Sequence, residues 1–544
     1  MPGLQAKERK TDLEEMAQTP LDVLVIGGGI TGAGIAWDAS LRGMRVGLVE
    51  MQDFAEGTSS RSTKLVHGGL RYLQQYQLGV VRETGRERAV LYRLAPHVVR
   101  PTQMLLPLVP GGNYSRLTMS FGTWLYDRLA GVKKTERRKM LSAQETFQLE
   151  PLLTDWVNGG GLYYEYLTND ARLTVDVIKS AVSHGAFAVN HAKAEGLLYG
   201  GDGRIRGATI RDRVDGKAYE VQAKVVVNAA GPWVDQLRKM DHSMDEKHLL
   251  LAKGVHIVVP YDRLPLGRAV YFDNVDKRMI FAIPRGKITY IGTTDTEYEG
   301  DPAEVIPERE DVQYLLDAAS YIFPSTHLTL ADLCSSWAGV RPLIAEDGKQ
   351  ADEVSRKDEI WVSKSGLITI AGGKLTAFRK MAERAVDRIA VQLHALDGRS
   401  IVSARTIQVP ISGGECGGSE GFAQQRSKWV QQARERGLSE EDGVYLADQY
   451  GSNTLRLLDY WQNDGLAMAQ LRYAEEEERA VYPLDFLVRR SSYLFFEPQR
   501  YAESAARVVD QMAQYFHWNE QLREEQANQV QRTYAIATLK TYAA

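Results

Sequence analysis

The hydrophobic pattern near the N-terminus is an uninterrupted apolar run that stops at glycines. Residues 23–26 are Val, Leu, Val and Ile, and residues 27–29 are all glycine. A short β-branched run of this kind is typical of a strand that is buried on both faces. Residues 33–42 then have a helical composition. The pattern predicts a buried parallel strand, a tight turn and a helix.

Two later segments repeat the apolar run that ends in small residues. They are residues 224–231, Lys-Val-Val-Val-Asn-Ala-Ala-Gly, and residues 366–373, Gly-Leu-Ile-Thr-Ile-Ala-Gly-Gly. Three such strands, far apart in the chain, predict one sheet that is discontinuous in sequence. Because ligands of open parallel sheets bind beyond the carboxyl ends of the strands, one long ligand is able to touch all three turns.

The glycine spacing indicates the chemical class of that ligand. Gly27, Gly29 and Gly32 have the G-x-G-x-x-G spacing, which lets the backbone turn sharply and approach a pyrophosphate at a helix N-terminus. Residues 45–50 supply a second strand that ends in Glu50, an acid placed to accept hydrogen bonds from ribose hydroxyls. NAD enzymes more often confine their cofactor to one contiguous domain, so the dispersed strand ends favour FAD over NAD. A purely structural glycine turn is the alternative.

Two segments interrupt the cofactor sheet, and a third follows it. Residues 75–160 and 250–335 are expected to form a substrate cap with a mixed sheet, because strand-like stretches occur in the second of them. After a glycine-rich break, residues 405–544 become helical and charged. The FAD-binding domain is expected to comprise residues 20–74, 161–249 and 336–404. The predicted fold class is α/β, with a discontinuous Rossmann-like FAD-binding domain, a mixed-sheet substrate cap and a C-terminal helical domain.

Composition and charge narrow the function classes. With 44% hydrophobic and 25% charged residues and a formal net charge of −4, the chain lacks the positive field expected of a nucleic-acid-binding protein. Cys334 and Cys416 have no CxxC spacing, so we expect no disulfide framework, no metal site and a cytoplasmic location. The charged first twenty residues exclude a secretory signal, and no apolar run approaches the length of a membrane span. The acidic run 475–478 is expected to form a solvated helix face.

The segment that follows the second predicted strand carries a family resemblance. Residues 57–72, Gly-Thr-Ser-Ser-Arg-Ser-Thr-Lys-Leu-Val-His-Gly-Gly-Leu-Arg-Tyr, are too polar and glycine-rich for a core helix and are expected to form a binding loop. Together with residues 26–38, they closely resemble the bacterial FAD-dependent, respiratory glycerol-3-phosphate dehydrogenases. The resemblance continues through residues 42–43, 126–127, 169–173, 228–233, 253–257, 291–295, 337–343, 372–374 and 485–490. Asn169, Ala230 and Phe378 depart from the family's usual Asp, Thr and Tyr.

The resemblance implies FAD as cofactor and sn-glycerol 3-phosphate as substrate, with hydride transfer from C2 to flavin N5 and dihydroxyacetone phosphate as product. It also implies a membrane quinone as electron acceptor, so a peripheral docking surface on the cytoplasmic face of the cell membrane is expected. The oligomeric state stays open, with a homodimer among the states allowed. The residues expected to contact FAD are Ile26, Gly27, Gly28, Gly29, Ile30, Thr31, Gly32, Glu50, Met51, Thr58, Ser59, Ser60, Lys64, Leu65, His67, Gly68, Gly231, Trp233, Gly373, Lys374, Leu375 and Thr376.

The substrate phosphate requires cationic side chains. Arg71, Arg341 and Lys374 lie on glycine-flanked loops and not on a solvated helix face, and they match family positions, as does Tyr72 beside them. We expect at least two of the cations to touch the phosphate and the third to lie near the reacting hydroxyl, which makes Arg341 a catalytic candidate too. A structural salt bridge is the alternative for each.

The reaction also requires a base, and the flavin requires charge stabilisation. His67, in the binding loop, and His256, on a predicted strand, are the candidate bases. The sequence does not choose between them, because His256 also fits a hydrogen-bonded core position and His67 also fits packing against the flavin. A helix predicted from Lys374 to Leu393 is expected to direct its N-terminal N–H groups at the flavin N1 and C2 carbonyl.

Two rival functions share these features. An oxidase of the same fold would pass electrons to O2, whereas a flavin-binding sensor would need no cations beside the flavin. A basic cluster formed by Lys133, Lys134, Arg137, Arg138 and Lys139 is either a solvated loop or a contact for anionic lipid.

Overall fold

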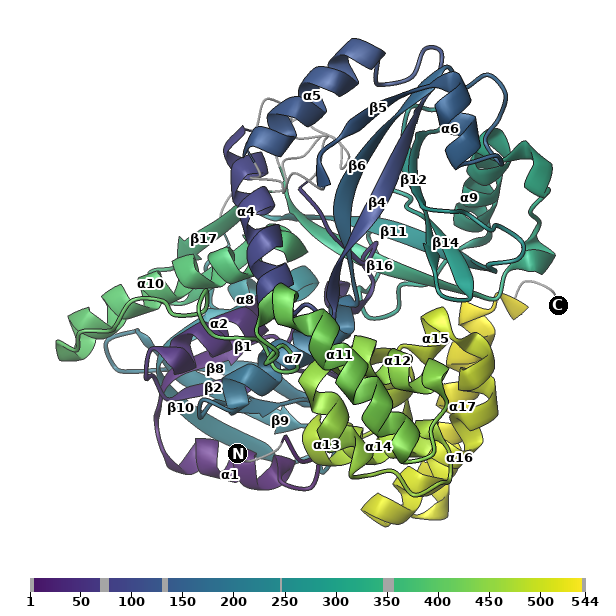
Figure 1. The fold of residues 1–544 in the computed structure, drawn as a ribbon. Helices are drawn as coiled ribbons and strands as arrows, with labels where there is room; N and C mark the ends of the chain where they lie inside the picture. The colour runs from purple at the N-terminus through teal and green to yellow at the C-terminus, as the bar shows by residue number, and fades with distance from the viewer. Residues whose placement is uncertain (1–3, 69–77, 130–135, 245–246, 346–356, 541–544) are drawn as a thin grey trace.

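The computed structural model of the protein describes residues 4–68, 78–129, 136–244, 247–345 and 357–540. The described part contains one sheet in the lower and one in the upper half of Figure 1, with a group of C-terminal helices beside them.

The lower sheet has the strand order β17, β18, β10, β1, β2, β7. Its strands are β1 (Leu21–Ile26), β2 (Val46–Val49), β7 (Phe187–Val189), β10 (Ala218–Asn228), β17 (Asp358–Val362) and β18 (Ile368–Gly372). Strand β10 pairs in parallel with both β1 and β18, so the three apolar runs that end in small residues are neighbours. The prediction of one sheet that is discontinuous in sequence, with these three strands parallel, is confirmed; at its edge, β17 pairs with β18 in antiparallel fashion. Strands β8 (Ala192–Tyr199) and β9 (Ile205–Asp212) extend the N-terminal half of β10 in antiparallel fashion.

Helices cover both faces of this sheet. Helices α2 (Ile30–Leu41), α7 (Asp170–Val182) and α10 (Phe378–Asp397) pack on one face, and α1 (Arg9–Gln18) packs on the other. Helices α2 and α10 meet at Gly34, where a Cβ atom would lie 2.9 Å from the Phe378 ring. Glycine at this position therefore permits the close approach of the two helices.

The upper sheet is mixed, as predicted. Its order is β15, β11, β14, β13, β12, β4, β6, β3, with β16 beside β11 and β5 beside β6. Strands β12 and β4 pair in parallel, and the other pairs are antiparallel. The strands are β3 (Leu65–Val66), β4 (Val99–Leu108), β5 (Lys139–Ser142), β6 (Gly159–Thr168), β11 (Leu249–Pro260), β12 (Ala269–Asp273), β13 (Met279–Arg285), β14 (Ile288–Gly292), β15 (Thr296–Glu297) and β16 (Ser335–Ile344). The helices attached to this sheet are α4 (Leu78–Leu94), α5 (Arg116–Leu129), α6 (Ala143–Leu149) and α9 (Arg309–Ile322).

The cap sheet extends beyond the domain boundaries expected from the sequence. Strands β3, β6 and β16 lie in it, although residues 20–74, 161–249 and 336–404 were expected to form the FAD-binding domain. Strands β3 and β16 contain cavity-lining residues, and β6 leads into α7, which begins at the cavity-lining Asp170. An apolar run alone does not indicate which of two adjoining sheets a strand joins.

The C-terminal region is helical, as predicted. It contains α11 (Gly418–Glu435), α12 (Glu440–Tyr450), α13 (Thr454–Leu458), α14 (Leu466–Glu477), a π-helical turn η8 (Asp485–Arg490), α15 (Tyr493–Phe496), α16 (Pro498–Phe516) and α17 (Glu520–Ala537). Helix α16 buries Val508, Val509 and Met512, which recur at helix spacing.

The acidic run at the end of α14 does not form a solvated face, so that prediction was wrong. Glu475 is 1% exposed and Glu478 is 0% exposed. Glu478 forms ion pairs with Arg172 and Lys179 of α7. The end of α14 is therefore docked against the FAD-binding domain, a contact that local sequence pattern does not reveal.

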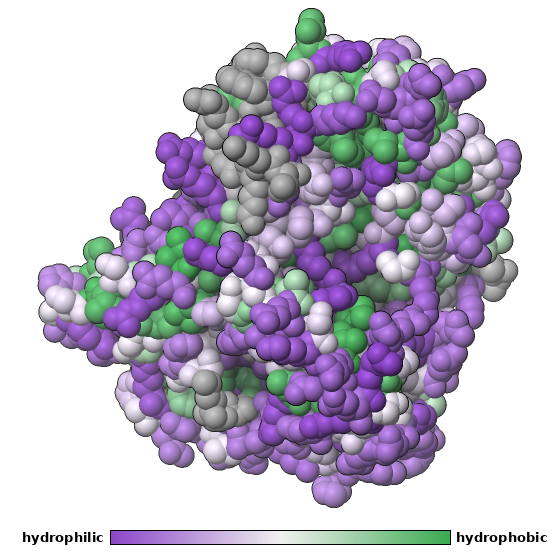
Figure 2. Space-filling view, viewed as in Figure 1, coloured by the Kyte–Doolittle hydropathy of each residue, from purple (hydrophilic) through white to green (hydrophobic). Residues whose placement is uncertain are grey.

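The hydropathy of one face and of the described helices bears on membrane insertion. The face shown in Figure 2 is mostly hydrophilic, with apolar groups scattered among polar ones. In the part of the chain that the structure describes, none of the helices combines the length and apolar character needed to cross a bilayer.

Candidate active site

The glycine turn between β1 and α2 is sterically restricted to glycine. A Cβ atom at Gly27, where φ is +119°, would lie 2.4 Å from the Ala229 carbonyl oxygen, and one at Gly32 would lie 1.9 Å from the Gly27 carbonyl oxygen. Gly29, at the N-cap of α2, has no side chain that could cap the helix; Ser59 Oγ accepts a hydrogen bond from the Ile30 N–H, and Ile30 and Thr31 line a cavity. The turn therefore fits a pyrophosphate approaching the helix N-terminus.

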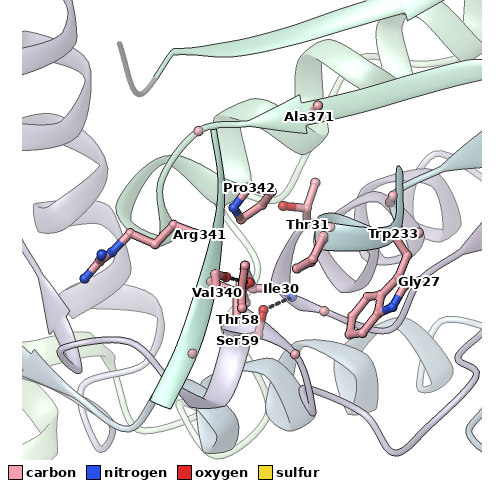
Figure 3. Close-up of a pocket in the computed structure, with 18 of the residues that line it drawn as sticks. Gly27, Ile30, Thr31, Thr58, Ser59, Trp233, Val340, Arg341, Pro342 and Ala371 are labelled. Carbon is pink, nitrogen blue, oxygen red and sulfur yellow. Dashed lines mark hydrogen bonds between the residues drawn. The ribbon is translucent and has the colours of Figure 1, made fainter. Parts of the chain in front are cut away.

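One continuous cavity runs past the ends of β1, β10 and β18 (Figure 3). The sequence-predicted residues that line it are Ile26, Gly27, Gly29, Ile30, Thr31, Glu50, Met51, Thr58, Ser59, Leu65, His67, Gly231, Trp233, Arg341, Gly373, Lys374, Leu375 and Thr376. Gly28, Gly32, Ser60, Lys64, Gly68 and His256 are not among the lining residues. Arg71 and Tyr72 lie outside the described residues.

Glu50 ends β2 at the cavity wall. Its Oε2 accepts a hydrogen bond from the Gly28 N–H at 2.7 Å, and its Oε1 accepts one from the Gln52 N–H at 2.9 Å. Burial raises the pKa of the carboxyl to about 7, although both hydrogen bonds favour the ionised form. A carboxylate held in this way has acceptor capacity left for a hydroxyl donor such as a ribose.

The loop 57–68 connects the FAD sheet to the cap. The Thr58 hydroxyl donates to the Val340 carbonyl of β16 at 2.6 Å, and Ser59 Oγ accepts from the Ile30 N–H at 2.9 Å. The Lys64 ammonium lies 2.7 Å from Asp170 of α7 and is buried. Lys64 therefore holds the loop in place through Asp170. A side chain in direct contact with the cofactor would line the cavity, and Lys64 does not.

The two described cations of the predicted phosphate site, Arg341 and Lys374, both line the cavity. Arg341, on β16, donates to Asp295 at 2.8 Å and to the Thr293 hydroxyl at 2.8 Å, so its guanidinium is held in place. Lys374 precedes the 3₁₀ turn η6 (Leu375–Ala377), which leads into α10. In Figure 3, Arg341 lies at the opposite end of the drawn group from Trp233. Arg341 therefore brings a cation to the cavity from the cap, and Lys374 brings one from the end of the FAD sheet.

His67 reaches the cavity directly. Its backbone is fixed by Thr376, whose hydroxyl oxygen accepts from the His67 N–H and whose hydroxyl donates to the His67 carbonyl, both at 3.0 Å. Phe281 of the cap meets the imidazole edge-on, with ring centroids 6.2 Å apart.

His256 lies one layer behind the cavity wall. It is 1% exposed, stacks on Trp337 with centroids 4.8 Å apart, and its Nε2 lies 3.0 Å from the Thr63 hydroxyl. Burial, and then the charges of Arg341 and Lys64, hold the pKa of His256 well below its usual value. Thr63 lines the cavity, so it joins His256 to the site, and sequence reasoning missed it.

Sequence reasoning also missed cavity walls that the cap, the start of β8 and the start of α7 supply. They include Gly254, Gly339, Val340 and Pro342 of the cap, Ala192 and Lys193 of β8, and Asp170 of α7. The residues at 192 and 193 follow β7, which pairs in parallel with β2 and ends beside Glu50. Their place just after a strand of this sheet was the signal that could have predicted a contact with the cavity. The cap residues had no comparable signal, because their approach depends on tertiary packing.

Comparisons with known proteins agree with this geometry. A family model described as FAD dependent oxidoreductase matches residues 22–379, and one described as the C-terminal domain of alpha-glycerophosphate oxidase matches residues 404–523. Proteins named aerobic glycerol-3-phosphate dehydrogenase are similar: that of Staphylococcus epidermidis is 48% identical over 97% of both chains, and that of Bacillus subtilis is 49% identical over 95% of both.

Solved structures extend the comparison. The glycerol-3-phosphate dehydrogenase from Bacillus halodurans complexed with FAD has a TM-score of 0.85 and 42% identity over 98% of both chains. The L-alpha-glycerophosphate oxidase from Mycoplasma pneumoniae with FAD bound has a TM-score of 0.56 and 17% identity, over 71% of this chain and 97% of that chain. The second likeness shows a shared fold.

Proposed function

Because this chain belongs to the FAD-dependent, aerobic glycerol-3-phosphate dehydrogenase family, we propose that it oxidises sn-glycerol 3-phosphate to dihydroxyacetone phosphate and passes the electrons to a membrane quinone. The observation that carries the proposal is that Arg341, Lys374 and His67 line the same cavity as the dinucleotide-binding glycine turn. When bound, FAD supplies the hydride acceptor, at flavin N5, for the hydrogen on C2 of the substrate.

Arg341 and Lys374 are proposed to bind the substrate phosphate. A phosphate dianion is recognised by a guanidinium fork together with a point charge, and both types line this cavity. The contacts of Arg341 with Asp295 and Thr293 orient the guanidinium before substrate arrives. Such preorganisation lowers the cost of binding.

The proton of the C2 hydroxyl is proposed to leave to one of two histidines. His67 would accept it directly at the cavity wall, whereas His256 would accept it through the Thr63 hydroxyl, 3.0 Å from Nε2. The depressed pKa keeps the His256 imidazole neutral at physiological pH, but it also makes that imidazole a weaker base than a histidine of ordinary pKa.

The direct test is anaerobic addition of glycerol 3-phosphate to the purified flavoprotein while flavin absorbance is followed. Bleaching of the flavin is expected to be fast with glycerol 3-phosphate and much slower with glycerol at the same concentration. No bleaching with glycerol 3-phosphate would reject the proposed substrate. Turnover in air with stoichiometric peroxide, and no stimulation by a soluble quinone, would favour the oxidase alternative, which shares the fold.

The quinone acceptor requires contact with a membrane surface, and we place that contact on α5. This helix lies at the top of the molecule in Figure 1, away from the C-terminal helices at the lower right, and Leu117 in its first turn is 83% exposed. Arg138, in the predicted basic cluster, donates to Ser120 of α5 at 3.0 Å, while Lys133 and Lys134 lie outside the described residues. Salt-sensitive cosedimentation with anionic vesicles, weakened by Leu117→Glu, is the expected result.

A further inference from the structure

The motif at residues 485–490, Asp-Phe-Leu-Val-Arg-Arg, is distant from the substrate wall in sequence and lines none of the active-site cavity. It forms the π-helical turn η8 in the C-terminal domain, and all six residues are buried. A polar motif buried in this way needs partners for its charges. Those partners come mainly from the segment that follows β2, residues 50–58.

Asp53 is the centre of this contact. It is fully buried, and both of its carboxylate oxygens are occupied. Arg490 donates to both oxygens, at 2.7 and 2.8 Å, Arg489 Nε donates to Oδ2, and Asn190 donates to Oδ1 at 2.9 Å. The two guanidinium groups hold the pKa of Asp53 well below its usual range.

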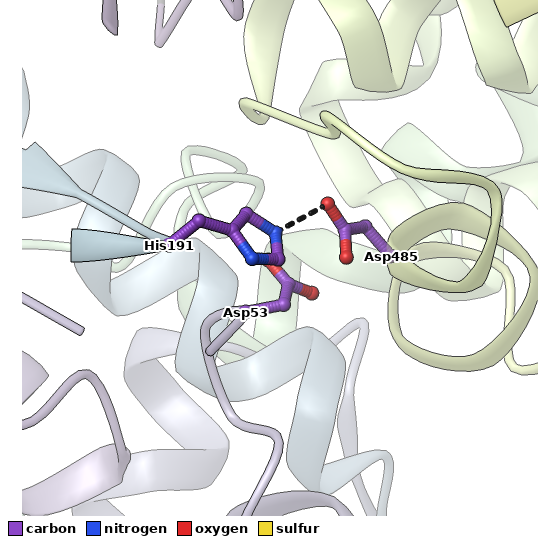
Figure 4. A group of neighbouring side chains, drawn as sticks. All are labelled: Asp53, His191 and Asp485. Atoms are coloured by element: carbon purple, nitrogen blue, oxygen red, sulfur yellow. Dashed lines mark hydrogen bonds and ion pairs between the residues drawn. The ribbon is translucent and has the colours of Figure 1, made fainter. Parts of the chain in front are cut away.

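His191 and Asp485 complete the cluster (Figure 4). The His191 Nε2 lies 3.0 Å from Asp485, which also accepts from the Val481 N–H at 2.8 Å. Asp53, His191 and Asp485 lie close enough together to suggest a metal site. Because Arg489 bridges Asp53 and Asp485, a metal ion there would meet two guanidinium charges, and the cluster is better described as a charge-balanced clamp.

The opposite side of the same segment faces the FAD cavity. Glu50, Met51, Glu56 and residues 57–59 line it. The Ala55 N–H donates to the Gly28 carbonyl at 3.0 Å, and a Cβ atom at Gly28 would lie 2.9 Å from the Phe54 ring. A displacement of residues 53–54 would therefore move both Gly28 and Glu50, two parts of the expected FAD contact.

We propose that the C-terminal helical domain is a positioning element for FAD, in which Arg489 and Arg490 hold Asp53 and thereby fix residues 50–58 in the FAD-binding conformation. Docking of η8 then strengthens FAD binding, and by thermodynamic linkage bound FAD strengthens the docking of η8 to the same extent. The inference rests on FAD as cofactor and not on the identity of the substrate. A failure of glycerol 3-phosphate turnover would leave it intact.

The first test measures FAD affinity by reconstitution of the apoprotein, followed through quenching of FAD fluorescence. Arg490→Lys and Arg490→Gln are compared with Arg172→Lys, a buried arginine that also pairs across the interface with the C-terminal domain but contacts Asp176 and Glu478. We expect the FAD Kd to rise about 10-fold in Arg490→Lys and about 100-fold in Arg490→Gln, with little change in Arg172→Lys. Equal changes in the Arg490→Lys and Arg172→Lys variants, or none in either Arg490 variant, would overturn the proposal.

The second test uses reciprocity and avoids any variant that fails to fold. Hydrogen exchange of the wild-type chain is compared with and without FAD at residues 479–492 and, as an internal reference, at α11 to α13. Protection by FAD is expected to be several-fold larger at residues 479–492 than in the reference helices. Equal protection of both regions would mean that FAD only stabilises the whole fold, and the clamp would have no special role.

Discussion

At the scale of single residues, Glu50 links the FAD site to pH. Its folded pKa of about 7 lies above the ordinary value of 4.5, so the apoprotein is stabilised by the bound proton at low pH and loses that stability as pH rises through 7. The loss between pH 5 and pH 8 is about 2 kcal/mol. Glu50→Gln is therefore expected to raise the Tm of the apoprotein at pH 8 and not at pH 5, while it weakens FAD binding. An equal Tm difference at both pH values would contradict this account.

The phosphate contact predicts a loss of specificity. Removing one partner of a desolvated charge pair costs about 2 to 5 kcal/mol, so Arg341→Ala or Lys374→Ala is expected to reduce kcat/KM for glycerol 3-phosphate about 30- to several-thousand-fold. The slow rate with glycerol is expected to change little, because glycerol carries no phosphate for Arg341 or Lys374 to contact. Both substrates are measured with both variants. An unchanged preference would show that the phosphate binds elsewhere.

The two histidines make different predictions. Loss of the general base is expected to slow anaerobic flavin reduction about 10²- to 10⁴-fold, so His67→Asn and His256→Asn are compared under identical conditions. If His256 is the base, the wild-type rate is expected to be flat between pH 6 and pH 8, since the pKa of His256 lies well below its usual value of 6.5. Small and equal effects of both substitutions would require another path for the proton.

At the scale of helices and strands, the contact between α2 and α10 depends on Gly34. A Cβ atom there would lie 2.9 Å from the Phe378 ring and 3.1 Å from Ala382. Gly34→Ala is expected to lower the free energy of unfolding by about 1 to 3 kcal/mol through overpacking. Gly79→Ala, in α4, is the control, because a Cβ atom there meets no neighbouring atom. A Tm of Gly34→Ala equal to that of the wild type would show that the helices relax without cost.

The elements also show what the sequence was able to predict. Strands β1, β10 and β18 were predicted because each is an apolar run that ends in small residues. This pattern is local and can be recognised from the sequence alone. The membership of β6 and β16 in the cap sheet was not predicted, because strand pairing is decided by tertiary contacts that an apolar run does not reveal. Thr63 was missed for the same reason: its role depends on His256, 193 residues away in the chain.

At the scale of the whole molecule, polar groups join the C-terminal helices to the FAD-binding domain. Arg172 of α7 is fully buried and pairs with Asp176 and with Glu478 of the C-terminal region. The N-terminal segment adds a backbone hydrogen bond from the Ala6 N–H to the Glu475 carbonyl at 2.8 Å. The end of α14 therefore contacts two other parts of the chain, which explains why its acidic residues are buried.

This contact makes the stability of the whole chain depend on pH at Glu475. Burial, reinforced by repulsion from Glu476, raises the pKa of Glu475 to about 8. The bound proton therefore stabilises the fold below the ordinary value of 4.5, and this contribution falls as pH rises through 8. Between pH 6 and pH 9 the loss is about 3 kcal/mol.

Glu475→Gln is consequently expected to reduce the fall in Tm between pH 6 and pH 9, measured on the FAD-loaded protein by thermal unfolding. Glu477→Gln is the matched control, because Glu477 is two residues away on the same helix and is paired with Arg456 at 2.8 Å. The control is expected to keep the wild-type fall in Tm. Equal pH dependence of the wild-type protein and Glu475→Gln would show that the buried carboxyl ionises without cost, and that the packing of α14 relaxes to admit water at high pH.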